Sequence, residues 1–156
     1  GTPDRVKRIY RDFITRGDFP LEKFTTFKAE GMSEMVLVKG IHFYSLCEHH
    51  ILLFFGEAAV AYIPRDSIVG LSKIPRVVNW YSNRLQNQER ITKQVAEYMQ
   101  AKLNPIGVAV HLRARHMCME MRGVRAQGSL TQTTWLTGAF LEKPEARAEF
   151  LSLLKR

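Results

Sequence analysis

Two apolar stripes at helical spacing follow one another in the middle of the chain, and they constrain the fold more than any other feature. Residues three and four positions apart share one face of a helix, so each stripe marks a face that must be buried. A polar stretch at 86–90 separates the stripes, and 104–107 (Asn-Pro-Ile-Gly) stops the second. We therefore expect two helices that each lay one face on another layer. The first stripe is Ile74, Val77, Val78, Tyr81 and Leu85, and the second is Ile91, Val95, Tyr98, Met99 and Leu103.

Segments rich in strand-forming residues flank the two helices in pairs. Residues 35–38 and 41–44 predict one strand with a bulge at Gly40, and residues 51–63 predict the next, ending at Pro64. Two further strands are expected after the helices, at 108–113 with alternation continuing to Cys118, and at the Thr-rich segment 131–140.

Helical patterns also stand at both ends of the chain. Thr2 is expected as an N-cap with Pro3 at the first helical position, and Gly17 ends this segment. Residues 144–154 predict a terminal helix. Strands that come in pairs, instead of alternating singly with helices, predict an α+β fold with one antiparallel sheet backed by helices on one face.

The length and composition indicate one domain over residues 1–156. The chain has 156 residues, of which 46% are apolar and 24% charged, and it contains no repeat and no Pro/Gly/Ser-rich linker. No apolar run is long enough for a transmembrane helix, and no secretory leader pattern is present. Two cysteines are too few for a disulfide scaffold, so we expect a cytoplasmic protein with reduced thiols that are free to bind metal.

The net charge of +8 favours an anionic partner. Nucleic acid and a phosphorylated small molecule are the two classes to consider. The basic residues are spread along the chain without a block of like charges. The sequence therefore predicts no disordered basic arm of the kind that binds nucleic acid.

A cysteine and a histidine three residues apart form the most informative motif, in 45–50 (Ser-Leu-Cys-Glu-His-His). In a turn, that spacing can bring Cys47 and His50 onto one metal ion. The other cysteine, Cys118, lies two residues after His116, and in a strand both would share one face. Two thiolates and one imidazole would form a catalytic zinc site that leaves a position for water. The alternative is that the cysteines are buried as small apolar side chains.

The head of the first central helix combines a hydroxyl with two cations. Ser72, Lys73 and Arg76 stand where backbone amides are also free, which suits a phosphate group. The alternative is that Ser72 only caps the helix and the cations are solvated.

The polar stretch between the two helices offers a second binding element. Gln88 and Glu89 could hold a polar heterocycle, because a carboxylate accepts from the N–H groups of a guanine edge. The alternative is a polar turn whose Glu89 favours the helix macrodipole.

Taken together, these segments resemble the GTP cyclohydrolase I family over essentially the whole chain. The resemblance is carried by Thr2-Pro3 with Arg5-Val6, by 45–50, by 62–64 with 70–73 and Arg76, by 84–92, and by 116–124.

The resemblance implies the tunnelling fold, in which a four-stranded antiparallel sheet carries two antiparallel helices on one face, with N- and C-terminal helices added. Subunits of the family join their sheets into rings, two pentameric rings stack as a decamer, and active sites lie where subunits meet. The N-terminal extension of longer members is expected to be absent here.

The resemblance also implies roles for individual residues, with GTP as substrate. It places Zn²⁺ on Cys47, His50 and Cys118, and guanine on Gln88 and Glu89. It places the triphosphate near Arg122, Lys73, Arg76, Arg5 and Arg8, with Ser72 beside them. His116 and His49 are the implied acid/base groups, with Ser72 assisting later proton transfers.

The implied reaction is hydrolytic opening of the guanine ring at C8, release of formate and rearrangement to 7,8-dihydroneopterin triphosphate, the first step of tetrahydrofolate and pterin biosynthesis. In this scheme His116 protonates N7. Neither a nucleic acid nor a membrane is expected as partner, and the sequence leaves a regulatory protein partner unknown. A catalytically silent purine- or pterin-binding module on the same fold is the alternative.

Overall fold

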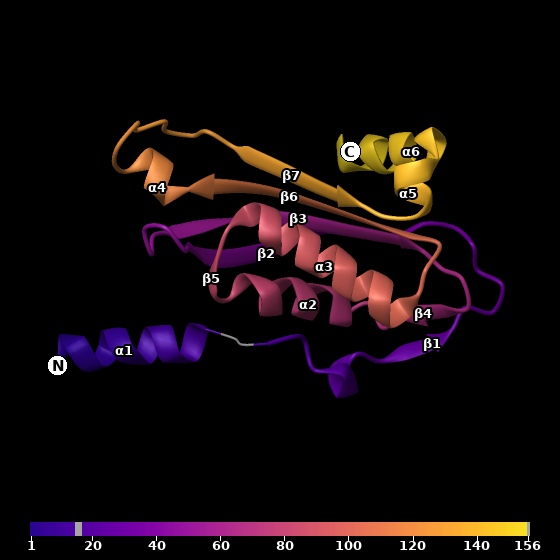
Figure 1. Cartoon of the computed structure of the whole chain (residues 1–156), viewed down its shortest axis with the longest axis horizontal. Coiled ribbons are helices and arrows are strands. Elements are labelled where there is room, and N and C mark those ends of the chain that lie inside the picture. The colour runs from indigo at the N-terminus through magenta and orange to yellow at the C-terminus, as the bar shows by residue number, and fades with distance from the viewer. Residues whose placement is uncertain (15–16, 156) are drawn as a thin grey trace.

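Four long antiparallel strands form the centre of the protein. The computed structural model describes residues 1–14 and 17–155 (Figure 1). The strands lie in the order β2, β3, β6, β7, and a short strand, β5, joins the free edge of β2 in the parallel direction. Their bounds are β2 Val36–Cys47, β3 Leu53–Ile63, β5 Leu85–Gln86, β6 Gly107–His116 and β7 Thr131–Leu136. The predicted α+β class is confirmed, and β5 extends the expected four-stranded sheet.

Two helices, α2 (Lys73–Ser82) and α3 (Gln88–Leu103), cover one face of this sheet. The side chain of Asn87 caps α3, and Asn104 ends it in the left-handed conformation. Both apolar stripes point into the main core, as predicted, with one exception. Leu85 lies in β5 and is exposed, because the chain has already left α2 at Ser82.

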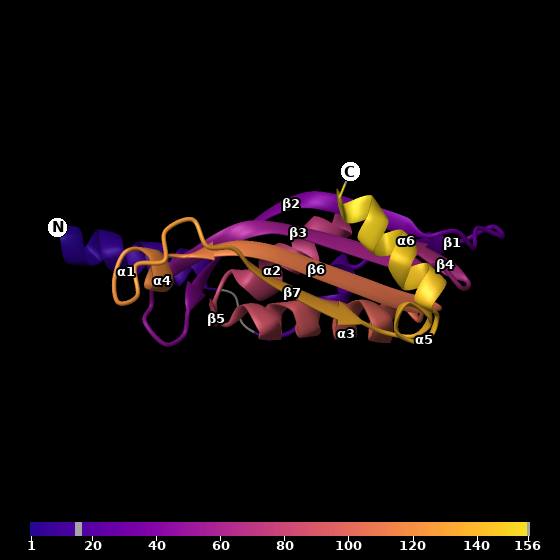
Figure 2. The same cartoon turned by 90° about the horizontal axis from the view of Figure 1, so that it is seen from above.

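The C-terminal helices pack against the opposite face of the sheet (Figures 1 and 2). These are α5 (Ala139–Glu142) and α6 (Pro144–Lys155). Phe140 and Phe150 form a small second core there with Ala61 of β3 and Ala109 of β6. Helices therefore lie on both faces, whereas the order of elements alone predicted one.

Three predicted strand boundaries were wrong, each for a local reason. The strand expected from residue 51 begins at Leu53, because Ile51 has a positive φ in the preceding turn. The strand expected to residue 140 ends at Leu136, after which Gly138 turns the chain at φ 48°. The alternation expected to continue to Cys118 stops at His116, and Cys118 lies in the short helix α4 (Met117–Glu120).

The N-terminal segment extends away from the sheet (Figure 1). Helix α1 (Thr2–Phe13) buries none of its residues, and it begins at Thr2 with Gly1 as N-cap, one residue before the predicted position. A 3₁₀ turn (Leu21–Lys23) leads to β1 (Thr26–Lys28), which pairs with β4 (Ser67–Val69) in a separate two-stranded sheet. No helix among the described residues is long and apolar enough to cross a membrane.

Gly56 permits the close approach of β3 and β6. A Cβ atom at this position would lie 1.9 Å from the carbonyl oxygen of Arg113. We expect Gly56→Ala to lower the free energy of unfolding by about 1–3 kcal/mol, since the two strands must separate to admit the methyl group. Urea denaturation at fixed protein concentration measures this. Gly70→Ala is the control, because a Cβ there meets its nearest atom at 3.6 Å; equal losses in both variants would contradict the explanation.

Candidate metal and nucleotide site

Cys47, His50 and Cys118 converge at one end of the sheet. Their ligand atoms all lie within 4.8 Å of one another, and Cys47 Sγ is 3.8 Å from His50 Nδ1. Cys47 ends β2, and His50 lies in the turn that leads to β3. The predicted ligand set is therefore brought together.

Cys118 reaches this cluster by a different route from the one predicted. The strands β2 and β6 are not neighbours, because β3 lies between them. Phe54 of β3 pairs with Ser45 on one side and with His116 on the other, so the ends of β2 and β6 emerge at the same end of the sheet. The turn of α4 after His116 then places Cys118 beside Cys47.

The thiol of Cys118 holds its proton more tightly than usual while no metal is bound. Burial raises the pKa of Cys118, and the neighbouring Cys47 raises it further, while Arg122 opposes the shift. A divalent cation would reverse this balance, because thiols lose their protons when they ligate a metal. Two soft sulfur ligands with one imidazole suit a zinc-like ion better than magnesium or calcium.

His116 is held beside the cluster by Gln88. The amide nitrogen of Gln88 donates to Leu112 O at 3.2 Å and to Thr131 O at 3.0 Å, so its Oε1 is left as an acceptor for His116 Nε2 at 2.8 Å. His116 Nε2 therefore carries the proton in this arrangement. The ring also stacks on Phe54 with centroids 4.6 Å apart, and burial lowers its pKa.

The other residues expected near the cluster are exposed around it. Arg122 Nη1 lies 3.5 Å from His50 Nε2, and His49 Nδ1 lies 3.7 Å from Cys47 Sγ. Glu89 is exposed in the first turn of α3, next to Gln88. Gln88 itself is buried, and both polar atoms of its side chain already have partners within the chain.

The residues expected to bind the triphosphate lie in separate parts of the chain: beside the cluster, at the start of α2 and on α1. Ser72, Lys73 and Arg76 lie at the start of α2, and this end of the helix points away from β5 and the cluster (Figure 1). Ser72 occupies the N-cap position without a side-chain capping bond, so the simple capping interpretation is not what the structure shows. Arg5 and Arg8 lie on the projecting helix α1.

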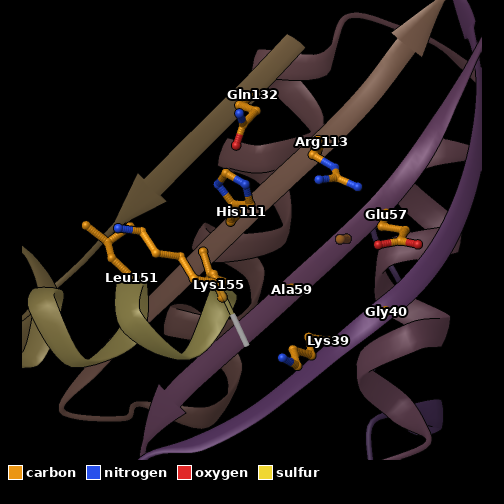
Figure 3. Close-up of a pocket in the computed structure, with 11 residues that line it drawn as sticks. Lys39, Gly40, Glu57, Ala59, His111, Arg113, Gln132, Leu151 and Lys155 are labelled. Carbon is orange, nitrogen blue, oxygen red and sulfur yellow. The ribbon is translucent and has the colours of Figure 1, made fainter. Parts of the chain in front are cut away.

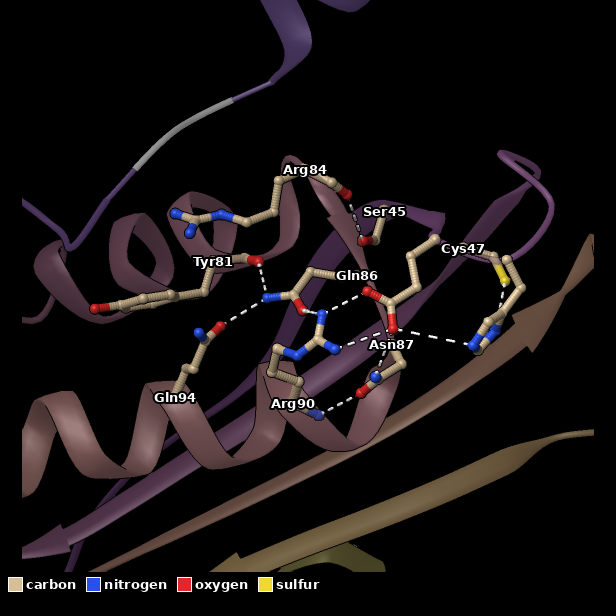
Figure 4. Close-up of polar contacts among 10 residues, drawn as sticks. Ser45, Cys47, Tyr81, Arg84, Gln86, Asn87, Arg90 and Gln94 are labelled. Carbon is tan, nitrogen blue, oxygen red and sulfur yellow. Dashed lines mark hydrogen bonds and ion pairs between the residues drawn. The ribbon is translucent and has the colours of Figure 1, made fainter.

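Sequence reasoning missed two forked ion pairs that hold the cluster. Arg90 donates to Glu48 (Figure 4), and Arg115 donates to Glu120, in each case through two nitrogens. Each arginine holds the pKa of its carboxyl partner below the usual value. Glu48 and Arg90 both stand inside motif segments, which was the one signal available from the sequence.

A wide hollow lies elsewhere, on the sheet face that carries α6 (Figure 3). It measures about 810 Å³ and is lined by Lys39, Glu57, His111 and Arg113, with Leu151 on the side of α6. Cys47, His50 and Cys118 do not line it, so this hollow is separate from the candidate metal site.

Fold and site together define an α+β protein with a Cys₂His cluster that could hold a metal ion, next to a half-buried imidazole. The sequence model of the GTP cyclohydrolase I family matches residues 1–155, and the chain belongs to this family. Its activity is accordingly that of a GTP cyclohydrolase, an enzyme of the first step of pterin and folate biosynthesis.

Curated relatives support this assignment over nearly the full chain. GTP cyclohydrolase 1 of Sulfurihydrogenibium sp. (strain YO3AOP1) is 51% identical over 154 residues, which cover 98% of this chain and 81% of the relative. The enzyme of Aquifex aeolicus (strain VF5) is 48% identical over 154 residues, covering 99% and 83%. Among solved structures, the apo form of the archaeosine synthase QueF-Like shares the fold, with a TM-score of 0.56 at 21% identity over 67% of this chain and 93% of that one.

Replacing one thiol should abolish metal binding. We expect Cys118→Ser to lower the metal content of zinc-loaded protein from stoichiometric to near zero, because two ligands hold an ion far less tightly than three. Elemental analysis after gel filtration measures this. His42→Ala is the control, since this exposed histidine lies on β2 away from the cluster. Full metal content in the serine variant would contradict the ligand assignment.

Proposed function

We propose that the cluster is the catalytic centre at which the guanine ring of GTP is opened at C8, with release of formate and rearrangement to 7,8-dihydroneopterin triphosphate. The observation that carries this proposal is the convergence of Cys47, His50 and Cys118 within 4.8 Å, next to the held imidazole of His116. Family membership supports the reaction, and the convergence of these side chains supports the cluster as its location.

Cys47, His50 and Cys118 would hold Zn²⁺. Three protein ligands are the usual number in a catalytic zinc site, which keeps one position for water. A zinc ion bound there would supply activation of that water as a nucleophile near neutral pH.

His116 would move the proton that ring opening requires. Burial keeps it neutral at rest by lowering its pKa, and Gln88 occupies its Nε2. Its Nδ1 is therefore the atom that can take up a proton as water adds to C8 and deliver it to N7 of guanine. His49, exposed beside Cys47, is the candidate for the later proton transfers, with Ser72.

Glu89 and Gln88 would divide the recognition of the base. The Glu89 carboxylate is exposed at the start of α3, where it can accept hydrogen bonds from the N–H edge of guanine. Gln88 would act indirectly, by holding His116. It could contact the base only after giving up one of its present hydrogen-bond partners.

The triphosphate would be bound between subunits. Within one chain, Arg122 is at the cluster but Ser72, Lys73 and Arg76 lie at the far end of α2, so a second copy would have to bring them to the site. Helix α1, with Arg5 and Arg8, buries none of its own residues, which suits packing on another copy. We propose the tunnelling-fold decamer of two stacked pentameric rings, in which sheet edges pair between subunits. The cytoplasmic location, the single domain and the absence of nucleic-acid and membrane partners stay predictions.

Mixed oligomers test whether two chains build one site. Cys118→Ser and Lys73→Gln should each be inactive alone. Co-assembled in equal amounts, they should recover about a quarter of wild-type formate release, because a site needs intact Cys118 from one copy and intact Lys73 from its neighbour. Cys118→Ser mixed with His116→Ala is the control, which should stay inactive because both residues come from one chain. Verified mixed oligomers of the first pair without recovery would contradict the shared site.

The role of His116 can be separated from metal binding. His116→Ala should retain zinc yet lose formate release by at least about 100-fold, the usual range for a general acid–base group. Formate release from GTP and zinc content are measured on the same sample. His111→Ala, on the same strand but facing the hollow of Figure 3, should leave formate release unchanged. Normal turnover by His116→Ala would remove this residue from the reaction.

A further inference from the structure

Glu48 and Arg90 have no part in the reaction proposed above, although both stand in motif segments. Their side chains meet as a fork, with Arg90 Nη1 2.6 Å from Glu48 Oε2 and Nη2 3.0 Å from Oε1. Asn87 Nδ2 adds a third donor to the same carboxylate at 3.2 Å. Both donors, Arg90 and Asn87, lie at the start of α3 (Figure 4).

This fork joins the two halves of the site. Glu48 lies in the turn that carries Cys47, His49 and His50, while Arg90 lies in the first turn of α3, which carries Gln88 and Glu89. The two residues are 42 positions apart in the sequence. The contact therefore links the metal-binding turn to the helix end that would recognise the base.

Both residues of the fork also form hydrogen bonds with Gln86. The backbone amide of Glu48 donates to Gln86 O at 3.0 Å, and Arg90 Nη1 also reaches Gln86 Oε1 at 3.3 Å. Gln86 is almost fully buried and donates to Tyr81 O at 3.0 Å and Gln94 Oε1 at 2.7 Å. The fork is thus connected through Gln86 to both α2 and α3 (Figure 4).

We propose that Glu48 and Arg90 are positioning residues that hold the turn 47–50 at the correct distance from the first turn of α3. The inference rests on the proposed function, in which one substrate bridges both segments. Guanine is a rigid bicyclic ring. If the first turn of α3, which holds one edge of the ring, moves relative to the metal-binding turn, C8 moves away from the attacking water by the same distance. Misplacement of about 1 Å at a reacting atom costs on the order of 100-fold in rate.

Glu48 also faces the proposed acid–base group. Its Oε1 lies 3.9 Å from His49 Nε2, so the carboxylate that Arg90 holds is also the charged group nearest this exposed imidazole among the described contacts. Removing the fork would take away the side-chain link between this turn and α3, and it would free the carboxylate that faces His49.

Two comparisons argue that the role is positional and not one of general stability. The side chains of Glu48 and Arg90 are 31% and 43% exposed, and ion pairs this open contribute little to folding. The other fork, Arg115–Glu120, joins residues only five positions apart and so holds α4 to the end of its own strand. Among the forks of the described residues, Glu48–Arg90 alone connects the two halves.

Kinetics of Glu48→Gln, Arg90→Gln and the double variant test the proposal. Each single variant should lower kcat for formate release about 10- to 100-fold, as loss of a group that orients a metal ligand or catalytic residue does. The KM for GTP should change by less than about threefold, and zinc content, oligomeric state and thermal midpoint should be retained, because binding groups stay in place. The double variant should be no worse than the worse single one, since the two residues act as a unit.

Conservative and control variants complete the experiment. Arg90→Lys keeps the charge without the fork and should recover only part of kcat. Glu97→Gln breaks an exposed ion pair with Lys93 on the same helix, 3.7 Å long, and should leave kcat unchanged. If a glutamine variant does not assemble, Arg90→Lys is used for the test instead. The criterion is the same: kcat should fall while the KM for GTP changes by less than about threefold.

The outcomes separate this inference from the proposed function. Unchanged kcat, a loss seen only in KM, or losses that multiply in the double variant would each overturn the positioning role. His116→Ala and Cys118→Ser are assayed in parallel. If those variants keep full activity, the proposed site fails, whereas their inactivity together with a normal Glu48→Gln variant overturns only the positioning role.

Discussion

The pairing of β3 with both β2 and β6 is the constraint on which the site depends. Because Phe54 pairs with Ser45 on one side and His116 on the other, the segments that leave β2 and β6 emerge at the same end of the sheet. A one-residue slip of either strand would reverse which face its side chains occupy, so the buried core that sets the register also sets the cluster. The convergence of Cys47, His50 and Cys118 therefore depends on strand packing far from these three residues.

Buried polar contacts orient the side chains that lie next to the cluster, above all the imidazole of His116. Gln88 uses its amide nitrogen on Leu112 and Thr131 of two adjacent strands, so only its oxygen faces His116. That arrangement specifies the tautomer of a half-buried imidazole, and in the proposed function the second nitrogen transfers the proton. In the proposed function, phosphate recognition is organised differently, because Lys73 and Arg76 lie at the far end of α2 from the same chain's cluster. Under this proposal, one chain supplies the metal ligands and His116, and a second chain supplies the cations at the start of α2.

Features with a local signal were predicted from the sequence, and features that depend on distant segments were not. Helical periodicity placed the stripes of α2 and α3, and the three-residue spacing placed Cys47 with His50. Cys118 lies beside Cys47 and His50 as predicted, but it was assigned to a strand, since the single turn of α4 is too short to show a period. Amphipathicity did not say which sheet face α6 covers, and nothing local marks Glu48 as the partner of Arg90.

The most direct test of the central claim is formate release from GTP by the same preparation before and after its metal is removed. The account predicts that chelated, still assembled protein releases no formate, and that zinc restores formate and oxidised-pterin fluorescence together. Restored metal content and activity should rise in parallel, because the ligands lie beside the proton-transfer group His116. Undiminished formate release by metal-free protein would contradict the assignment of Cys47, His50 and Cys118 as the catalytic centre.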